Sequence, residues 1–199
     1  MYELIILILL VRFPASGYKI AHIINDIIGP YARMSNGRLY PLLARMEENG
    51  LIELHEEVNP EQRGERNARP YQITAAGRKR FHALMMDTTS NPGEYQRTFR
   101  QKVPVFYLLQ PSERLYLLDH YSNYCQAHIL HLIAERDDLA KGNYTSYEHA
   151  SVSLNATLDV MKHMGEQWQA ELEWVRHLRE QEIARWEGDR SEGATTVSE

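Results

Sequence analysis

The sequence predicts a mainly α-helical protein whose two parts have different residue patterns. Up to about residue 90, apolar residues at helical spacing alternate with two short runs that are typical of strands. From residue 91 to 187 the apolar residues follow helical spacing only, and no segment favours a strand. We therefore expect domains at residues 1–90 and 91–187. The remaining residues, 188–199, are mostly Gly, Ser, Thr and acidic, and we expect them to be disordered.

The first half should begin with three helices. The apolar residues 3–13 predict a buried helix that Pro14 ends. Ser16 is placed to cap a second helix, which Gly29-Pro30 should stop. Glycine accepts the left-handed backbone conformation easily, so Gly50 is a suitable end for a third helix.

That third helix should begin near Ser35 and Asn36, and residues 39, 42, 43 and 46 give it one apolar face. Pro41 lies within it. Proline cannot donate the helical backbone hydrogen bond, so we expect the helix to start late or to bend at this residue.

A two-stranded hairpin should follow the three helices. Residues 51–58 and 70–73 have strand-like patterns, and residues 59–69 between them contain Pro, Gly and three arginines. Thr74 is placed to cap a fourth helix, and residues 89–93 resemble a turn-rich linker. Three helices followed by a hairpin with arginines at its tip is the order of elements in a winged helix-turn-helix domain.

In that architecture the third helix enters the major groove of DNA. Arginine and asparagine are the side chains that pair bidentately with guanine and adenine, and arginines of the wing meet the backbone or the minor groove. The DNA-binding candidates on the third helix and in the wing are Ser35, Asn36, Arg38, Tyr40, Arg45, Arg63, Arg66 and Arg69.

The second half should form long helices with a coiled-coil-like seam. After Pro111, and again from about residue 147 to 186, apolar positions alternate in steps of three and four. This is more apolar stripe than one antiparallel helix pair usually hides, so we expect an all-α dimerisation domain that forms a two-fold dimer. The dimerisation candidates are Leu115, Leu118, Ile129, Leu132, Leu158, Met161, Trp168, Leu172 and Val175.

Several motifs resemble the PadR family of transcriptional regulators. They are Gly17-Tyr18-Lys19-Ile20, the stretch at residues 35–43, the stretch at residues 48–52 and the stretch at residues 69–77, in the family's order within residues 4–86. The resemblance implies phosphate contacts from Tyr18 and Tyr40 and places Lys19 among the DNA-binding residues. It also implies that a bend at Pro41 is tolerated.

The second half is similar, at residues 108–118 and 170–174, to the C-terminal domain of a subfamily of that family. This subfamily includes virulence activators and phenolic-acid-responsive repressors. The resemblance implies a homodimer in which the C-terminal helices embrace the partner.

The net charge of −5 does not by itself favour a nucleic-acid partner, but the charge is unevenly divided. Residues 1–90 hold 11 Lys and Arg against 10 Asp and Glu, whereas residues 91–199 hold 11 against 17. The clustering of cations matters more for phosphate binding than their sum. The single cysteine, Cys125, and the absence of a signal peptide or an apolar run of about 20 residues predict a cytoplasmic protein without a membrane partner.

We find no motif for catalysis and expect no cofactor. The sequence has no nucleophile elbow, no phosphate-cradling glycine loop and no metallohydrolase motif. His128, His131 and Glu135 share a helix face and could ligate zinc. No cysteine pair or further histidine motif accompanies them, so we predict no metal site.

The expected function is a homodimeric transcriptional repressor that binds an inverted-repeat operator, since a protein on a promoter blocks polymerase without further contacts. A small aromatic effector, such as a phenolic acid, could release it from a pocket near Arg12, Phe106 and Tyr107. Two alternatives are an activator without an effector and a helical adaptor whose winged helix contacts proteins. Replacing the wing arginines should abolish DNA binding in a regulator and change nothing in an adaptor.

Overall fold

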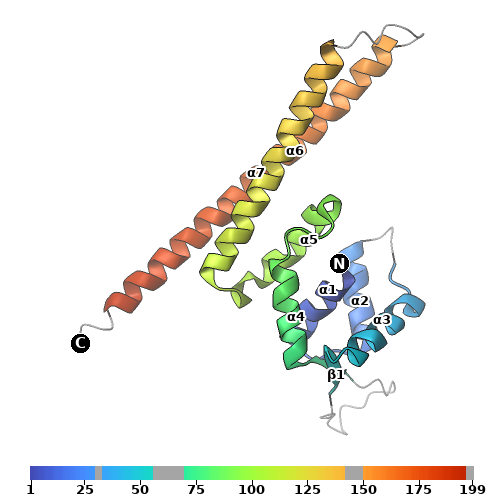
Figure 1. Cartoon of the computed structure of the whole chain (residues 1–199), viewed down its shortest axis with the longest axis vertical. Helices are drawn as coiled ribbons and strands as arrows, with labels where there is room; N and C mark the ends of the chain where they lie inside the picture. Colours follow the sequence, from blue (N-terminus) through green and yellow to red (C-terminus); the bar gives the residue numbers. More distant parts are fainter. Residues whose placement is uncertain (30–32, 56–69, 142–149, 196–199) are drawn as a thin grey trace. The chain divides into compact units, whose positions relative to one another are not determined.

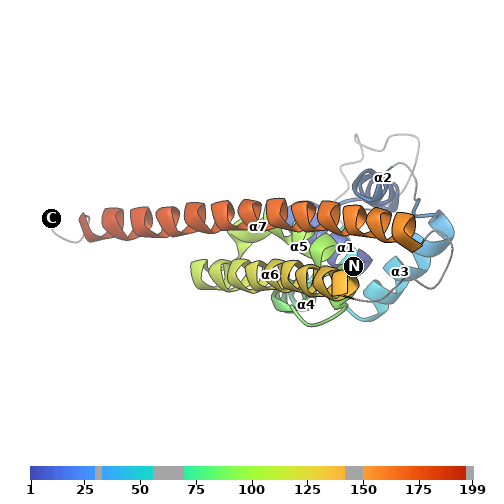
Figure 2. The same cartoon turned by 90° about the horizontal axis from the view of Figure 1, so that it is seen from above.

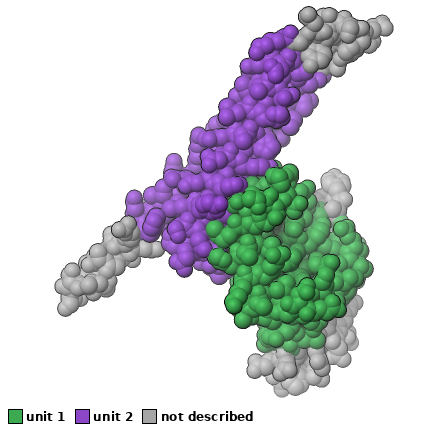
Figure 3. Space-filling view, in the orientation of Figure 1, with its two compact units in different colours: residues 1–105 green, residues 106–199 purple. Residues whose placement is uncertain are grey.

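The computed structural model of the protein describes residues 1–29, 33–55, 70–141 and 150–195, with side chains in the last range described from 154 to 188. Two compact units make up the chain, residues 1–105 and 106–199 (Figure 3). The predicted fold class is confirmed: nearly all described elements are helices, and the strands of the first unit form one two-stranded sheet.

The first unit contains the elements of the predicted winged helix (Figure 1). Its end also differs from the prediction, because α5, which carries the buried Tyr95 and Phe99, belongs to this unit, and the unit closes at Val105 instead of near residue 90. The elements are α1 (Tyr2–Arg12), α2 (Gly17–Ile28), α3 (Asn36–Glu48), β1 (Ile52–Leu54), β2 (Tyr71–Ile73), α4 (Ala75–Met86), η2 (Pro92–Glu94), α5 (Tyr95–Lys102) and the start of η3 (Val103–Leu108).

The predicted helix ends are confirmed. The Ser16 hydroxyl accepts a hydrogen bond from the backbone N–H of Lys19, and Thr74 caps α4 in the same way. At the end of α3, Gly50 has a φ of 66° and donates to the carbonyl of Glu47. The N–H of Leu51 reaches back to the carbonyl of Met46, which completes a Schellman motif.

Of the two effects expected from Pro41, the late start is wrong, because the helix begins at Asn36 and includes Pro41, whereas the bend stays a prediction. Pro41 has no backbone N–H, so the carbonyl of Gly37 lacks its usual partner one turn later. Both residues are exposed, and water can therefore satisfy that carbonyl. The cost that proline imposes inside a buried helix is reduced at this position.

The two strands form an antiparallel hairpin in which Ile52 pairs with Ile73. Ala15, between α1 and α2, adds a bridge to this hairpin by exchanging two backbone hydrogen bonds with Tyr71. The bridge ties the start of α2 to the sheet. The core of the unit lies around α1, which packs against α2, α4 and β2 and buries Leu4, Ile5, Ile6, Leu7, Leu9 and Leu10.

The second unit is an antiparallel hairpin of α6 (Pro111–Lys141) and α7 (Ala150–Thr195), which lie side by side in both views (Figures 1 and 2). The predicted start of α6 at Pro111 is confirmed. The helix α7 continues to Thr195, so the prediction of a disordered tail is wrong for residues 188–195. No described helix is long and apolar enough to cross a membrane.

Polar pairs fix the register of this hairpin. The Tyr121 hydroxyl donates a 2.5 Å hydrogen bond to Glu171, and both residues are buried. Arg114 forms a part-buried ion pair with Glu182 at 2.8 Å, and Arg179 pairs with Asp119 at the surface. From Arg114 to Tyr121 the residue numbers on α6 rise while those of their partners on α7 fall, as they must in an antiparallel helix pair. These pairs therefore hold one register.

The packing of the hairpin differs between its two halves. Near the start of α6, the side chains of Leu117, Leu118, Tyr121 and Cys125 are fully buried, and Val175 of α7 is buried with them. In the other half, none of the residues 126–141 and 154–170 is buried. One chain therefore forms a closed core in only one half of its hairpin.

Candidate nucleic-acid interface

The outward face of α3 is built from small residues as far as Ala44 and ends on the exposed Glu48. Leu39, Leu43 and Met46 are buried and define the inner face. At 100° per residue, Gly37, Pro41 and Ala44 lie on the opposite side, and all three are exposed. Small side chains on this outer stripe allow the helix backbone to approach another surface closely.

Candidate base-reading side chains flank this outer stripe. Arg38 and Arg45 lie along one flank, and Asn36 and Tyr40 lie along the other. All four are exposed, as is Ser35 at the helix start. Arg38 and Arg45 form no ion pair with any residue in the described ranges. Their positive charges are therefore available to a phosphate or a guanine.

The start of α2 lies next to Tyr40. A Cβ atom on Gly17 would fall 3.2 Å from the Tyr40 hydroxyl oxygen, so that hydroxyl lies beside the first turn of α2. The N-terminus of a helix favours anions. Tyr18 in the same turn is 63% exposed. Lys19 is also exposed, and its ammonium lies 4.4 Å from the centroid of the Phe13 ring, a cation–π contact that leaves its donors accessible.

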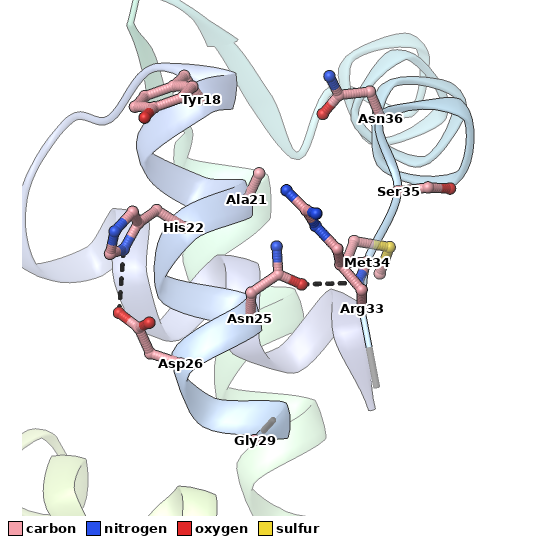
Figure 4. Close-up of a pocket in the computed structure, with 10 residues that line it drawn as sticks. All are labelled: Tyr18, Ala21, His22, Asn25, Asp26, Gly29, Arg33, Met34, Ser35 and Asn36. Atoms are coloured by element: carbon pink, nitrogen blue, oxygen red, sulfur yellow. Dashed lines mark hydrogen bonds and ion pairs between the residues drawn. The ribbon is translucent and has the colours of Figure 1, made fainter. Parts of the chain in front are cut away.

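A groove of about 1030 Å³ lies between α2 and the start of α3 (Figure 4). The Asn25 side-chain oxygen accepts a 2.6 Å hydrogen bond from the backbone N–H of Met34 and thereby holds the two sides together. Arg33 lines this groove and was not among the predicted residues. Residue spacing could not have revealed it, because Arg33 precedes the helix and its direction depends on the fold. The lining residues are Tyr18, Ala21, His22, Asn25, Asp26, Gly29, Arg33, Met34, Ser35 and Asn36.

Seven predicted DNA-binding residues thus lie exposed on α2, on α3 or directly before α3. They are Tyr18, Lys19, Ser35, Asn36, Arg38, Tyr40 and Arg45. The wing residues Arg63, Arg66 and Arg69 lie outside the described residues, and their contact with DNA stays a prediction.

The predicted effector residues come from both units. Arg12 is exposed at the end of α1 in the first unit. In the second unit, Phe106 is buried and Tyr107 is 62% exposed. A pocket shared by these residues stays a prediction.

The predicted dimerisation residues divide into two groups. Leu118, Leu172 and Val175 are buried within the hairpin of one chain, where they pack inside a monomer. The other six are only half-buried: Leu115, Ile129, Leu132, Leu158, Met161 and Trp168. Ile129, Leu132 and Met161 line an apolar groove of about 280 Å³ between α6 and α7.

His128, one of the two histidines that could ligate zinc, packs in an aromatic cluster. The His128 ring stacks on Trp168 with a centroid distance of 4.1 Å and an interplanar angle of 5°, and Tyr124 meets both rings at their edges. Burial, together with the neighbouring His131, lowers the pKa of His128 and favours its neutral ring. Among the described residues, no three His, Cys, Asp or Glu side chains gather as they would around a metal.

Residues 6–83 match the family described as the transcriptional regulator PadR-like family. The chain is also similar to solved structures of Bacillus subtilis PadR. The complex with operator DNA is 19% identical with a TM-score of 0.39, and the complex with p-coumaric acid is 19% identical with a TM-score of 0.37. Each covers 87% of this chain and 98% of the solved chain.

The virulence activator AphA of Vibrio cholerae is 21% identical with a TM-score of 0.37, covering 93% of this chain and 99% of its own. No curated protein sequence matches this chain.

Proposed function

Because residues 6–83 belong to the PadR-like family of transcriptional regulators, we propose that this chain regulates transcription by reading duplex DNA with α3. The observation that carries the proposal is the outer surface of α3. Its small outer stripe lies between the polar residues Asn36 and Tyr40 on one flank and Arg38 and Arg45 on the other, and neither arginine has an ion-pair partner among the described residues. Such a surface suits insertion into a major groove, where arginine and asparagine distinguish guanine and adenine.

We further propose that the regulator acts as a homodimer. In the half of the hairpin formed by residues 126–141 and 154–170, none of the described residues is buried, although apolar side chains such as Leu130 and Val160 are 66% and 57% exposed. Exposed apolar area of this kind favours a second copy. Two recognition helices related by a two-fold axis would require an inverted-repeat operator, with half-sites one or two helical turns apart.

Repression is the simplest outcome of such binding, because a dimer on a promoter obstructs polymerase. Release by a small aromatic effector, such as a phenolic acid, is part of the proposal. It rests on the resemblance described above and on the residue types of Arg12, Phe106 and Tyr107. A ligand can shift the protein between two states only by its differential affinity for them.

The test begins with selection of preferred sequences from a random duplex library, followed by anisotropy titrations. Arg38→Ala should lose sequence discrimination worth roughly 1–3 kcal/mol. Arg97→Ala, which removes an exposed arginine from α5, is the matched control for net charge and should bind as wild type does. Unchanged preference in the Arg38 variant would rule out α3 as the reading element. Failure of the wild type to bind any duplex would instead favour the adaptor alternative.

A further inference from the structure

The groove between α2 and α3 contains a cation that the reading surface of α3 does not use. Arg33 projects into the space between the two helices (Figure 4). An acidic residue, Asp26, also lines the groove, but its carboxylate lies 3.0 Å from the ring of His22. No described residue forms an ion pair with Arg33, so its guanidinium keeps its five donors accessible.

The backbone that follows Arg33 is anchored to α2. The neighbouring Met34 has a buried side chain, only 4% exposed, and its N–H bonds to Asn25. Such anchoring limits the positions that the Arg33 side chain can reach. Tyr18 and Asn36, which carry a hydroxyl and an amide, line the same groove. The groove therefore combines a cation with neutral hydrogen-bonding groups.

We propose that Arg33 binds a backbone phosphate of the DNA strand that borders the major groove occupied by α3, with Tyr18 and Asn36 beside it. This inference rests on the proposed function. The planar guanidinium fork matches phosphate oxygens bidentately. The groove is large enough for a drug-sized ligand and thus larger than one free phosphate needs, which favours a linked chain of phosphates and sugars.

The charge of Asp26 provides an independent check of this assignment. A carboxylate that lines a phosphate-binding groove opposes the bound anion through like-charge repulsion. Asp26→Asn keeps the shape of the side chain and removes its charge. It should strengthen binding of every duplex about two- to threefold, and the same substitution at the exposed Asp159 of α7 should not.

The principal experiment compares Arg33→Ala, Arg33→Lys and the control Arg97→Ala on the selected operator and on a scrambled duplex over a range of salt concentrations. Loss of a charge-assisted contact should weaken both duplexes by roughly tenfold or more. The dependence of log affinity on log salt should fall by about 0.9, the value for one phosphate. Arg33→Lys should recover part of the affinity, because lysine keeps the charge and loses the fork.

The outcomes separate this inference from the proposed function. If Arg33→Ala matches Arg97→Ala while the wild type still prefers its operator, the phosphate assignment fails and the proposed function stands. A changed base preference in Arg33→Ala would overturn the phosphate assignment, because it would show that Arg33 reads a base. Calorimetry with inorganic phosphate and with ATP tests whether the groove binds a free phosphate compound instead of the DNA backbone. Tight ATP binding that Arg33→Ala abolishes, without an effect on DNA, would mark a nucleotide site instead. A wild type that binds no DNA overturns both.

Discussion

The ring of Tyr40 on α3 lies against the backbone of Gly17 in the first turn of α2, so closely that a side chain at position 17 would displace it. A Cβ atom there would come within 2.9 Å of the Tyr40 Cε1 atom, a distance at which one of the two must move. Tyr40 is 46% exposed and can therefore rotate away at little cost. This contact fixes the position of the tyrosine hydroxyl relative to the start of α2.

Gly17→Ala should therefore impair DNA binding more than it impairs folding. We expect the displaced Tyr40 to lose a phosphate contact worth roughly 1.5–3 kcal/mol, the range for hydrogen bonds to charged groups. The free energy of unfolding should change by less than about 1 kcal/mol, since alanine is a good helix former. Tyr40→Phe removes the hydroxyl alone and should match the DNA defect without a change in stability. Wild-type affinity in both variants would contradict the contact.

Gly77→Ala should destabilise the first unit. A Cβ at this buried position would lie 2.0 Å from the backbone carbonyl oxygen of Leu51 and 2.7 Å from a side-chain carbon of Ile73. Backbone cannot rotate away, so the hairpin and α4 must separate, and overpacking of this kind costs roughly 1–3 kcal/mol or more. Chemical denaturation should show the loss. Gly93→Ala, where the added atom meets open space, is the control and should lie within about 0.5 kcal/mol of wild type.

The buried ammonium of Lys102 should make stability depend on pH in the alkaline range. Burial lowers the pKa of Lys102 from 10.5 to about 8, against a smaller opposing effect of Asp87, while its Nζ donates to the Asp87 carbonyl oxygen at 2.6 Å. Between these two pKa values the unfolded chain binds more protons than the folded chain, so the free energy of unfolding rises with pH in that window. Below about pH 8 Lys102 is protonated in both the folded and the unfolded chain, and the full cost of burying its charge lowers the free energy of unfolding.

Lys102→Met isolates this effect. Between pH 7 and pH 10 the free energy of unfolding of the wild type should rise by roughly 1–3 kcal/mol relative to that of the variant. Chemical denaturation at each pH measures this difference. A constant difference between the two proteins across that range would show that the lysine keeps its ordinary pKa in the fold.

Leu130→Glu and Val160→Glu should produce folded monomers. Both residues are exposed on the half of the hairpin in which no described residue is buried, so a charge there opposes a partner without disturbing the packing of one chain. Light scattering should give twice the chain mass of 23.2 kDa for the wild type and the chain mass itself for the variants. Leu172 was also a predicted dimerisation residue, but it is buried within the hairpin of one chain, so Leu172→Glu should unfold the hairpin and cannot test the dimer. A monomeric wild type at micromolar concentration would end the dimer proposal.

An anionic aromatic effector should depend on Arg12. Calorimetry with a panel of hydroxycinnamic acids should show binding that Arg12→Gln weakens, and a DNA-release assay should follow the same order. The control Arg97→Gln removes an equal charge from α5. If no acid binds below about a millimolar, the phenolic-acid version of the proposal is wrong.

Local signals in the sequence predicted much of this fold. Ser16, Thr74 and Gly50 fix helix ends through bonds within a few residues of each, so residue type and spacing sufficed. The late start at Pro41 was wrong because the cost of proline depends on whether the freed carbonyl is buried, which spacing does not show. The continuation of α7 to Thr195 was missed because an established helix extends at little cost even through a polar sequence.

The candidate site could be predicted only in part. Arg38 and Arg45 were found because helical periodicity places them away from the buried Leu39 and Met46. Arg33 was not, because its position depends on the hydrogen bond between Asn25 and Met34, nine residues apart. The predicted dimerisation residues also depend on tertiary contacts that spacing does not show. Periodicity identifies an apolar face of a helix, but it does not say whether the other helix of the same chain covers that face.

The unequal packing of the α6–α7 hairpin divides one helix pair into regions of different local stability. Amides around Leu117–Cys125 can exchange with solvent only when the buried core opens, whereas those of residues 126–141 need only a local opening of half-buried turns. A second copy that covers the latter half would slow their exchange in proportion to its occupancy, because a partner that binds only the closed form stabilises it by mass action. Hydrogen exchange in this half should therefore slow as protein concentration rises, while exchange around Leu117–Cys125 stays nearly constant.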